Sequence, residues 1–129
     1  MVNNNIFYNA INEDITMVKG DTLSFNFQID GMGADRFDDV VFTVKENPDS
    51  QTELFKCDLT EGVTCEVDEE NHLIYTLRVS PNKTKDLLVG AYYYDLVTLH
   101  SRDVLTFMRG RLNLVYTVRN TSEGGGVIG

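Results

Sequence analysis

The amino-acid sequence predicts an all-β fold, an immunoglobulin-like β-sandwich of about eight to nine strands with one short helix. Apolar and polar residues alternate along several segments that are rich in β-branched and aromatic residues. Alternation with a period of two is the pattern of a strand with one buried face. Turn residues separate these segments at the short intervals typical of sandwiches. Two packed sheets would bury apolar faces that one open sheet leaves exposed.

The clearest strand runs from Thr22 to Ile29, where alternation is unbroken and would place one set of apolar residues on the core face: Leu23, Phe25, Phe27 and Ile29. Weaker versions of the pattern predict further strands at 40–45, 73–79 and 111–119. Turn signals that contain glycine, proline, asparagine or aspartate lie between the strands, at 19–21, 30–33, 47–50, 61–62, 68–71, 101–103 and 109–110.

The segment 90–99 is apolar on both faces, which predicts a central strand. Tyr92 and Tyr94 would lie on one face, and Tyr93 and Asp95 on the other. If Asp95 is buried it needs a partner, because an unpaired buried carboxylate is costly. The cations available on other strands are Arg78, Arg109 and Arg111.

A short helix of one or two turns is predicted between Ser80 and Gly90. Ser80 is the candidate N-cap, Pro81 suits the first helical position and Gly90 suits the exit. Leu87 and Leu88 would then close one end of the sandwich, while Lys83 and Lys85 would face water.

With 129 residues the chain has room for about one domain. We expect the sandwich to span residues 13–120, preceded by an arm at 1–12 and followed by a flexible glycine-rich tail at 121–129. The start of the chain contains neither basic residues nor a long apolar stretch, so no secretory signal is expected. No segment is apolar enough to suggest a membrane span.

The formal net charge is −9, which argues against nucleic acid as a partner. The charge is distributed unevenly along the chain. Residues 46–70 contain nine acidic residues and one basic residue, whereas residues 71–129 contain seven basic and four acidic ones. Opposite patches of this kind would steer docking onto a partner, although ordinary surface variation would give the same count.

Cys57 and Cys65 flank a predicted hairpin turn at Thr60–Glu61, which would bring them opposite one another. They form either a cross-strand disulfide or two reduced thiols in the core, and the absence of an export signal favours the thiols. Their spacing does not match a zinc site. The acidic stretch 68–71 is interpreted as a solvated turn rather than a calcium site, because it lacks the EF-hand pattern.

No catalytic, cofactor-binding or metal-binding residue is predicted. His72 and His100 are the only histidines, and neither lies in a recognisable nucleophile motif. The tyrosines at 92–94 could form a stacking platform for sugars, but successive residues of a strand point alternately, which favours core packing. We therefore expect a protein that is not an enzyme.

Several residues are similar to a known family. A Lys-Gly-Asp-Thr sequence that ends in Gly20, Asp21 and Thr22 precedes the alternating strand. After the predicted helix comes Leu87-x-x-Gly90-x-Tyr92-x-Tyr94-Asp95-Leu96. Together these motifs resemble a β-sandwich domain of tailed-phage structural proteins, in particular the N-terminal docking domain of phage baseplate upper proteins. The resemblance spans roughly residues 13 to 119, and its motif residues are architectural.

The resemblance implies a structural or accessory protein of a phage or prophage particle, made in the bacterial cytoplasm and assembled into the virion. Its partners would be other virion subunits of the tail, baseplate, neck or capsid, or further copies of itself in a symmetric assembly. No stalk sequence follows Arg119, so a stand-alone component is expected. The alternative is a carbohydrate-binding or adhesin-type module for attachment to the host surface.

Overall fold

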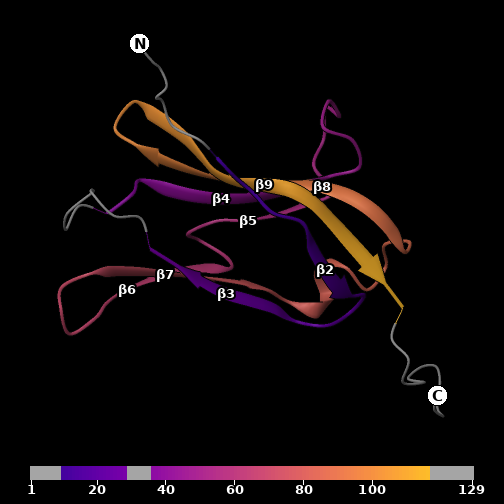
Figure 1. Cartoon of the computed structure of the whole chain (residues 1–129), viewed down its shortest axis with the longest axis horizontal. Helices are drawn as coiled ribbons and strands as arrows, with labels where there is room; N and C mark the ends of the chain where they lie inside the picture. The colour runs from indigo at the N-terminus through magenta and orange to yellow at the C-terminus, as the bar shows by residue number, and fades with distance from the viewer. Residues whose placement is uncertain (1–9, 29–35, 117–129) are drawn as a thin grey trace.

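The computed structural model describes residues 10–28 and 36–116, and these residues form two packed β-sheets (Figure 1). The larger sheet has the order β1-β9-β8-β4-β5, with β2 also pairing along β9. The smaller sheet has the order β3-β7-β6. The predicted all-β sandwich is confirmed. Among the described residues, no helix is long and apolar enough to cross a membrane.

The predicted strands at 40–45 and 73–79 match the structure closely, whereas the last strand begins at Asp103 and runs through the predicted turn at 109–110. The described residues form nine strands. They are β1 (Ile11–Asn12), β2 (Ile15–Val18), β3 (Leu23–Phe27), β4 (Asp39–Lys45), β5 (Phe55–Cys57), β6 (Val63–Val67), β7 (Leu73–Val79), β8 (Gly90–His100) and β9 (Asp103–Val115). The chain changes sheet after β2, β3, β5 and β7. This alternation between sheets gives the immunoglobulin-like arrangement.

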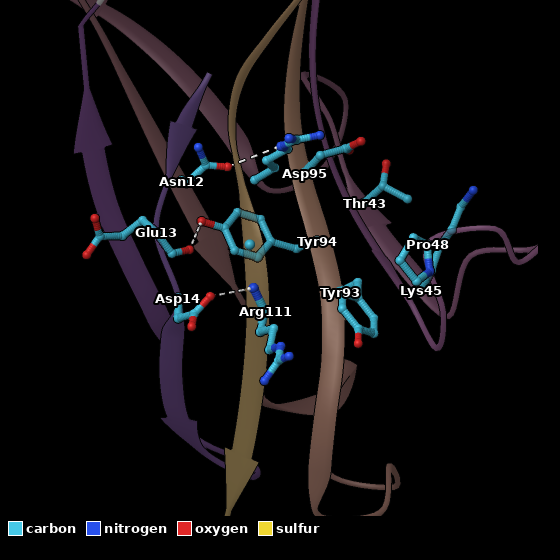
Figure 2. Close-up of a pocket in the computed structure, with 12 residues that line it drawn as sticks. Asn12, Glu13, Asp14, Thr43, Lys45, Pro48, Tyr93, Tyr94, Asp95 and Arg111 are labelled. Atoms are coloured by element: carbon cyan, nitrogen blue, oxygen red, sulfur yellow. Dashed lines mark hydrogen bonds between the residues drawn. The ribbon is translucent and has the colours of Figure 1, made fainter. Parts of the chain in front are cut away.

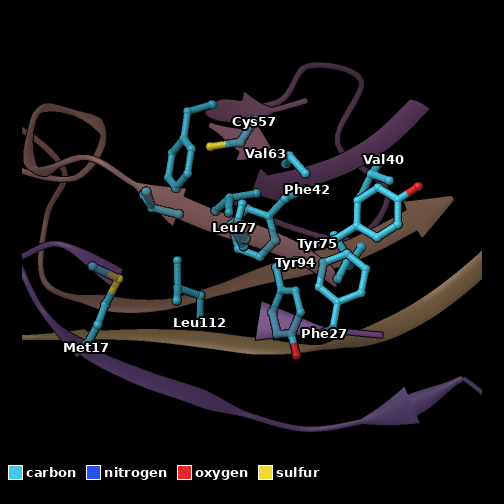
Figure 3. Packing of buried hydrophobic residues seen from close by; sticks show 14 of the residues in the cluster. Met17, Phe27, Val40, Phe42, Cys57, Val63, Tyr75, Leu77, Tyr94 and Leu112 are labelled. Carbon is cyan, nitrogen blue, oxygen red and sulfur yellow. The ribbon is translucent and has the colours of Figure 1, made fainter. Parts of the chain in front are cut away.

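Strand β8 is central, as its sequence predicts, because it pairs antiparallel with β4 on one side and with β9 on the other. The core lies between the two sheets (Figure 3). Val40, Phe42 and Val44 of β4 are fully buried, as are Leu77 and Val79 of β7. Such side chains recur at every second residue, so each strand presents one face to the core.

Aromatic rings fill one end of this core. The rings of Phe27 and Tyr75 stack with their centroids 5.5 Å apart, and Phe37 lies 5.3 Å from the same tyrosine ring. The backbone N–H of Phe37 donates a 2.9 Å hydrogen bond to the Tyr75 hydroxyl. The buried hydroxyl is therefore satisfied, as burial of a polar group requires.

The motif residue Gly20 lies in the turn between β2 and β3. Its φ of +84° favours glycine, and the N–H of Asp21 closes the turn on the carbonyl of Val18 at 3.0 Å. The Gly20 N–H donates to the hydroxyl of the fully buried Thr84 at 2.9 Å. This bond ties the turn to the segment before β8. Thr22 is exposed and precedes β3.

The segment between β7 and β8 contains less helix than predicted, only a 3-10 turn at Pro81–Lys83. Ser80 makes no capping bond to the backbone, because its hydroxyl contacts the side chain of Asn82 instead. Immediately after this turn the chain enters the interior, where Thr84 is fully buried. Leu87 packs against the core as expected, whereas Leu88 is 79% exposed.

The predicted exposure of Lys83 is also wrong. Its side chain is 19% exposed and its ammonium group lies 3.2 Å from a carboxylate oxygen of Glu61. The 3-10 turn therefore packs against the turn between β5 and β6. Lys85 is exposed, as predicted.

The predicted hairpin around Thr60–Glu61 does not form, because β5 pairs with β4 and β6 pairs with β7 in the other sheet. Cys57 lies opposite Phe42, and Cys65 opposite Tyr75. Both thiols are free. The chain passes between the sheets in a tight turn in which the N–H of Thr60 donates to the Asp58 carboxylate at 2.9 Å.

The ends of the chain are described only in part. Asn12, which the sequence assigns to the arm, pairs with Arg109 of β9. Residues 1–9 of the predicted arm lie outside the described residues, as do Ile29, the predicted turn at 30–33, residues 117–119 of the predicted last strand and the tail at 121–129.

Candidate functional site

A cavity of about 690 Å³ opens on the outer face of the six-stranded sheet (Figure 2). Residues of β4, β8 and β9 form its floor, and the link between β1 and β2 forms one wall. Successive side chains of a strand point to opposite faces of the sheet. Most of the floor residues occupy the strand positions that face outward, between the positions that fill the core. We call this cavity the outer groove.

Strand register arranges the floor in two rows. Asp95 of β8 lies opposite Thr43 of β4 and Arg109 of β9. Two residues away, Tyr93 lies opposite Lys45 and Arg111 in the same way. Lys45 and Arg111 therefore lie on either side of the Tyr93 ring (Figure 2). Neighbouring strands are about 4.8 Å apart, so one small ligand can contact a whole row.

The wall is held to β9 by side chains as well as backbone. The carboxamide of Asn12 accepts a 3.2 Å hydrogen bond from Nε of Arg109. The Asp14 carboxylate accepts the backbone N–H of Arg111 at 2.9 Å. Between them, the Glu13 N–H donates to the carbonyl of Arg109 at 3.0 Å. Together these bonds join β1 and β2 into one edge along β9.

Gly110 is part of this arrangement, although the sequence predicts a turn there. It lies in the middle of β9, and a Cβ at this position would be 2.1 Å from the carbonyl oxygen of Glu13. The glycine is required because the wall passes directly against the strand. A glycine inside a strand indicates either a turn or such a close approach, and only the fold distinguishes the two.

Burial governs the ionisation of two groups at the groove. It raises the pKa of Tyr94 to about 12, with the charges of Glu13 and Asp14 acting in the same direction. Burial also raises the pKa of Asp95, and the positive charge of Lys45 opposes this shift. In both cases the low-dielectric surroundings disfavour the charged form.

Of the three cations predicted as partners for Asp95, only Arg109 lies directly across from it. Arg111 is in the adjacent row, and Arg78 lies on β7 in the other sheet. Within residues 10–28 and 36–116, ion pairs of 4.0 Å or less involve only His72 and Lys83 as the cations. Asp95 therefore has basic neighbours without a direct ion pair.

The structure separates the motif residues that the sequence singles out. Gly20, Asp21 and Thr22 lie at the β2–β3 turn, whereas Tyr94 and Asp95 reach the outer groove. Tyr92 lies on the inward side of β8 and donates from its hydroxyl to the carbonyl of Leu88 at 2.6 Å. Gly90, with φ of +156°, begins β8 and has open space around it.

Sequence reasoning did not select Thr43, Lys45, Asn12 or Asp14. The outward parity of Thr43 and Lys45 on a strongly alternating strand is the signal that would have found the first two. No comparable signal exists for Asn12 and Asp14. Their position depends on parallel pairing with β9, almost a hundred residues later in the chain.

The two histidines lie elsewhere. His72 belongs to the turn between β6 and β7, where its backbone N–H donates to the Asp68 carboxylate at 2.8 Å. This hydrogen bond is the main cause that lowers the pKa of Asp68, and the stretch 68–71 forms a turn as predicted. His100 meets Phe37 edge-on at 6.4 Å. The described part of the chain contains no group of three side chains positioned to hold a metal ion.

Comparison with known proteins gives no family assignment. No protein-family model matches the chain, and no curated protein matches it. The outer groove itself provides hydrogen-bond donors from lysine and arginine, acceptors from carboxylates and the two aromatic side chains of Tyr93 and Tyr94. Its lining includes no histidine, cysteine or serine. These groups are suited to binding a polar ligand.

Proposed function

We propose that this chain is a non-enzymatic structural or accessory protein of a tailed phage or prophage particle. It docks onto other virion subunits of the tail, baseplate, neck or capsid. The motifs around Gly20 and Tyr94 support the proposal through their resemblance to the docking domain of baseplate upper proteins. The observation that carries docking is an exposed apolar end of the sandwich.

This end is formed by the two most exposed large apolar side chains of the described residues. Leu88 is 79% exposed and Tyr116 is 76% exposed. Gly90 pairs with Leu114, so Leu88 and Tyr116 leave the β8–β9 ladder at the same end. Single exposed apolar residues are ordinary, but a leucine and a tyrosine together suit the buried centre of an interface. We call this surface the Leu88/Tyr116 end.

Charge separation supports docking by the same domain. The acidic stretch 46–70 forms β5, β6 and their flanking turns, whereas β9 carries Arg109 and Arg111 in a groove where basic and acidic side chains are mixed. Strand β5 is at one edge of the six-stranded sheet, and β8 and β4 lie between it and β9. Such a distribution orients a charged partner during encounter and so favours one docking geometry.

The proposal is tested by purifying particles from the host strain that encodes the chain and probing them with an antibody against it. We expect the chain to co-sediment with the particles and to be labelled on them by immunogold. A double change, Leu88→Ser with Tyr116→Ser, should reduce incorporation at least severalfold. Val104→Ser is the matched control, because Val104 is 66% exposed at the opposite end of the β8–β9 hairpin.

Two results would contradict the proposal. One is a chain that stays in the soluble fraction of the lysate with no label on the particles. The other is equal incorporation of the double variant and the wild type, which would exclude the Leu88/Tyr116 end. Deletion of residues 121–129 tests the tail separately, and we expect it to weaken incorporation without changing the melting temperature.

A further inference from the structure

The outer groove contains charged side chains that the fold leaves without ion pairs. Lys45, Arg109 and Arg111 supply positive charge, and Glu13, Asp14 and Asp95 supply negative charge. In the described part of the chain, none of these six belongs to an ion pair of 4.0 Å or less. A side chain of this set can bond to a ligand if no other contact already uses it.

Three of these six side chains already have structural roles or point elsewhere. The Asp14 carboxylate accepts the Arg111 N–H, and the Arg109 side chain donates to Asn12. The Glu13 side chain points away from the floor of the groove (Figure 2). Lys45, Asp95 and the guanidinium group of Arg111 remain. Lys45 and Arg111 flank Tyr93, in the row next to that of Asp95.

This arrangement favours a ligand whose polar groups both donate and accept. A carboxylate or phosphate ligand would bind near Arg111 but would also lie close to Asp95 and Asp14. An ammonium ligand would meet Lys45 and the two arginines. A hydroxyl group donates to a carboxylate and accepts from a guanidinium or ammonium group at once, so it suits neighbouring residues of opposite charge.

Tyr93 adds a flat apolar surface to this polar floor. It is the one tyrosine of the 92–94 run that faces outward, because successive residues of a strand point to opposite faces. The hydroxyls of Tyr92 and Tyr94 bond instead to the backbone carbonyls of Leu88 and Glu13. A half-buried tyrosine ring presents an apolar face with a polar tip. The C–H face of a sugar ring packs on such a surface while its hydroxyls reach polar neighbours.

We propose that the outer groove binds a neutral saccharide, whose ring packs on Tyr93 and whose hydroxyls bond to Asp95, Lys45 and Arg111. The cavity of about 690 Å³ lies within the usual range for small-ligand sites, which is roughly 300–1,000 Å³. Saccharide binding is a further activity, on a different surface from the Leu88/Tyr116 end. A failure of the saccharide proposal would therefore leave the virion-docking proposal untouched, and the reverse also holds.

The test is a titration of ¹⁵N-labelled protein, followed by amide chemical shifts. The probes are cellohexaose, maltohexaose and chitohexaose at millimolar concentrations, with hexaglutamate and hexalysine as charged peptides. We expect at least one oligosaccharide to shift the amides of Thr43, Tyr93, Asp95 and Arg111. Tyr93→Ala should weaken that binding about tenfold, the loss of one good aromatic contact.

Tyr116→Ala is the matched control, since it removes an exposed tyrosine outside the groove, and its affinity should equal that of the wild type. Thermal melting checks that each variant is folded. If Tyr93→Ala is unfolded, Lys45→Ala replaces it, with a severalfold loss expected. The proposal is overturned if no oligosaccharide shifts the groove amides, if only a charged peptide does so, or if folded groove variants bind as tightly as the wild type.

Discussion

The hydroxyl of Tyr94 donates a 2.6 Å hydrogen bond to the backbone carbonyl of Glu13, 81 residues earlier in the chain. The same carbonyl lies directly against Gly110 of β9, and the Asp14 carboxylate accepts the Arg111 N–H at the next position. The central strand β8 thereby holds the N-terminal edge of the sheet in place. The wall of the outer groove depends on the same contact.

Tyr94→Phe should destabilise the fold by about 1–2 kcal/mol, because the Glu13 carbonyl loses its donor within a partly buried site. Urea unfolding measures the change. Tyr92→Phe is the control, since its bond to Leu88 is exposed, and we expect a loss of about 0.5 kcal/mol or less. Equal losses in the two variants would mean that the Tyr94–Glu13 bond contributes nothing specific.

Gly110→Ala should destabilise the protein by more than about 2 kcal/mol, because the added methyl group would overlap the Glu13 carbonyl and force the wall away from β9. Gly20→Ala is a useful comparison. Its new Cβ would have no neighbour closer than 3.9 Å, so only the positive φ opposes it, at about 1–2 kcal/mol. Hydrogen exchange at Arg111 should rise in Gly110→Ala alone. A Gly110→Ala protein as stable as the wild type would refute this role.

Asp95 should make stability depend on pH. Its folded pKa is raised by burial from the ordinary value of 3.8, so the folded state holds its proton more tightly than the unfolded state. This contribution is fully present below pH 3.8 and is lost as pH rises through the folded pKa. Asp95→Asn removes the loss, so its stability relative to the wild type should increase between pH 3 and pH 7. Urea unfolding across this range measures the difference in unfolding free energy between Asp95→Asn and the wild type. A difference that does not change with pH would contradict the raised pKa of Asp95.

The two cysteines should behave as independent thiols. Cys57 is fully buried and burial raises the pKa of its thiol, which reduces the reactive thiolate, whereas Cys65 is partly exposed. We expect a thiol reagent such as Ellman's reagent to label one cysteine in the native protein and the second only after unfolding. Cys65→Ser should abolish the native reaction. Formation of an intramolecular disulfide on mild oxidation of the folded protein would contradict the separation of β5 from β6.

Much of the fold was predictable because alternation is a local property of a strand. The pattern around Phe25 and Phe27 identified β3, the apolar character of both faces of 90–99 identified a central strand, and glycine identified the turn at Gly20. The acidic turn at 68–71 was also recognisable, because asparagine and aspartate bond to their own backbone in turns. These are interactions between near neighbours, which a short stretch of sequence contains.

Pairing between distant segments was decided only by the tertiary structure. The local sequence of residues 53–67 predicts a hairpin, yet the chain changes sheet near Asp58, because β5 pairs with β4 and β6 pairs with β7. Gly110 resembles a turn residue until Glu13 is brought against it. The outer groove exists because register brings residues of β4, β8 and β9 into two rows beside the link between β1 and β2. Register is a property of the whole sheet, and alternation along one strand does not determine which strand lies beside it.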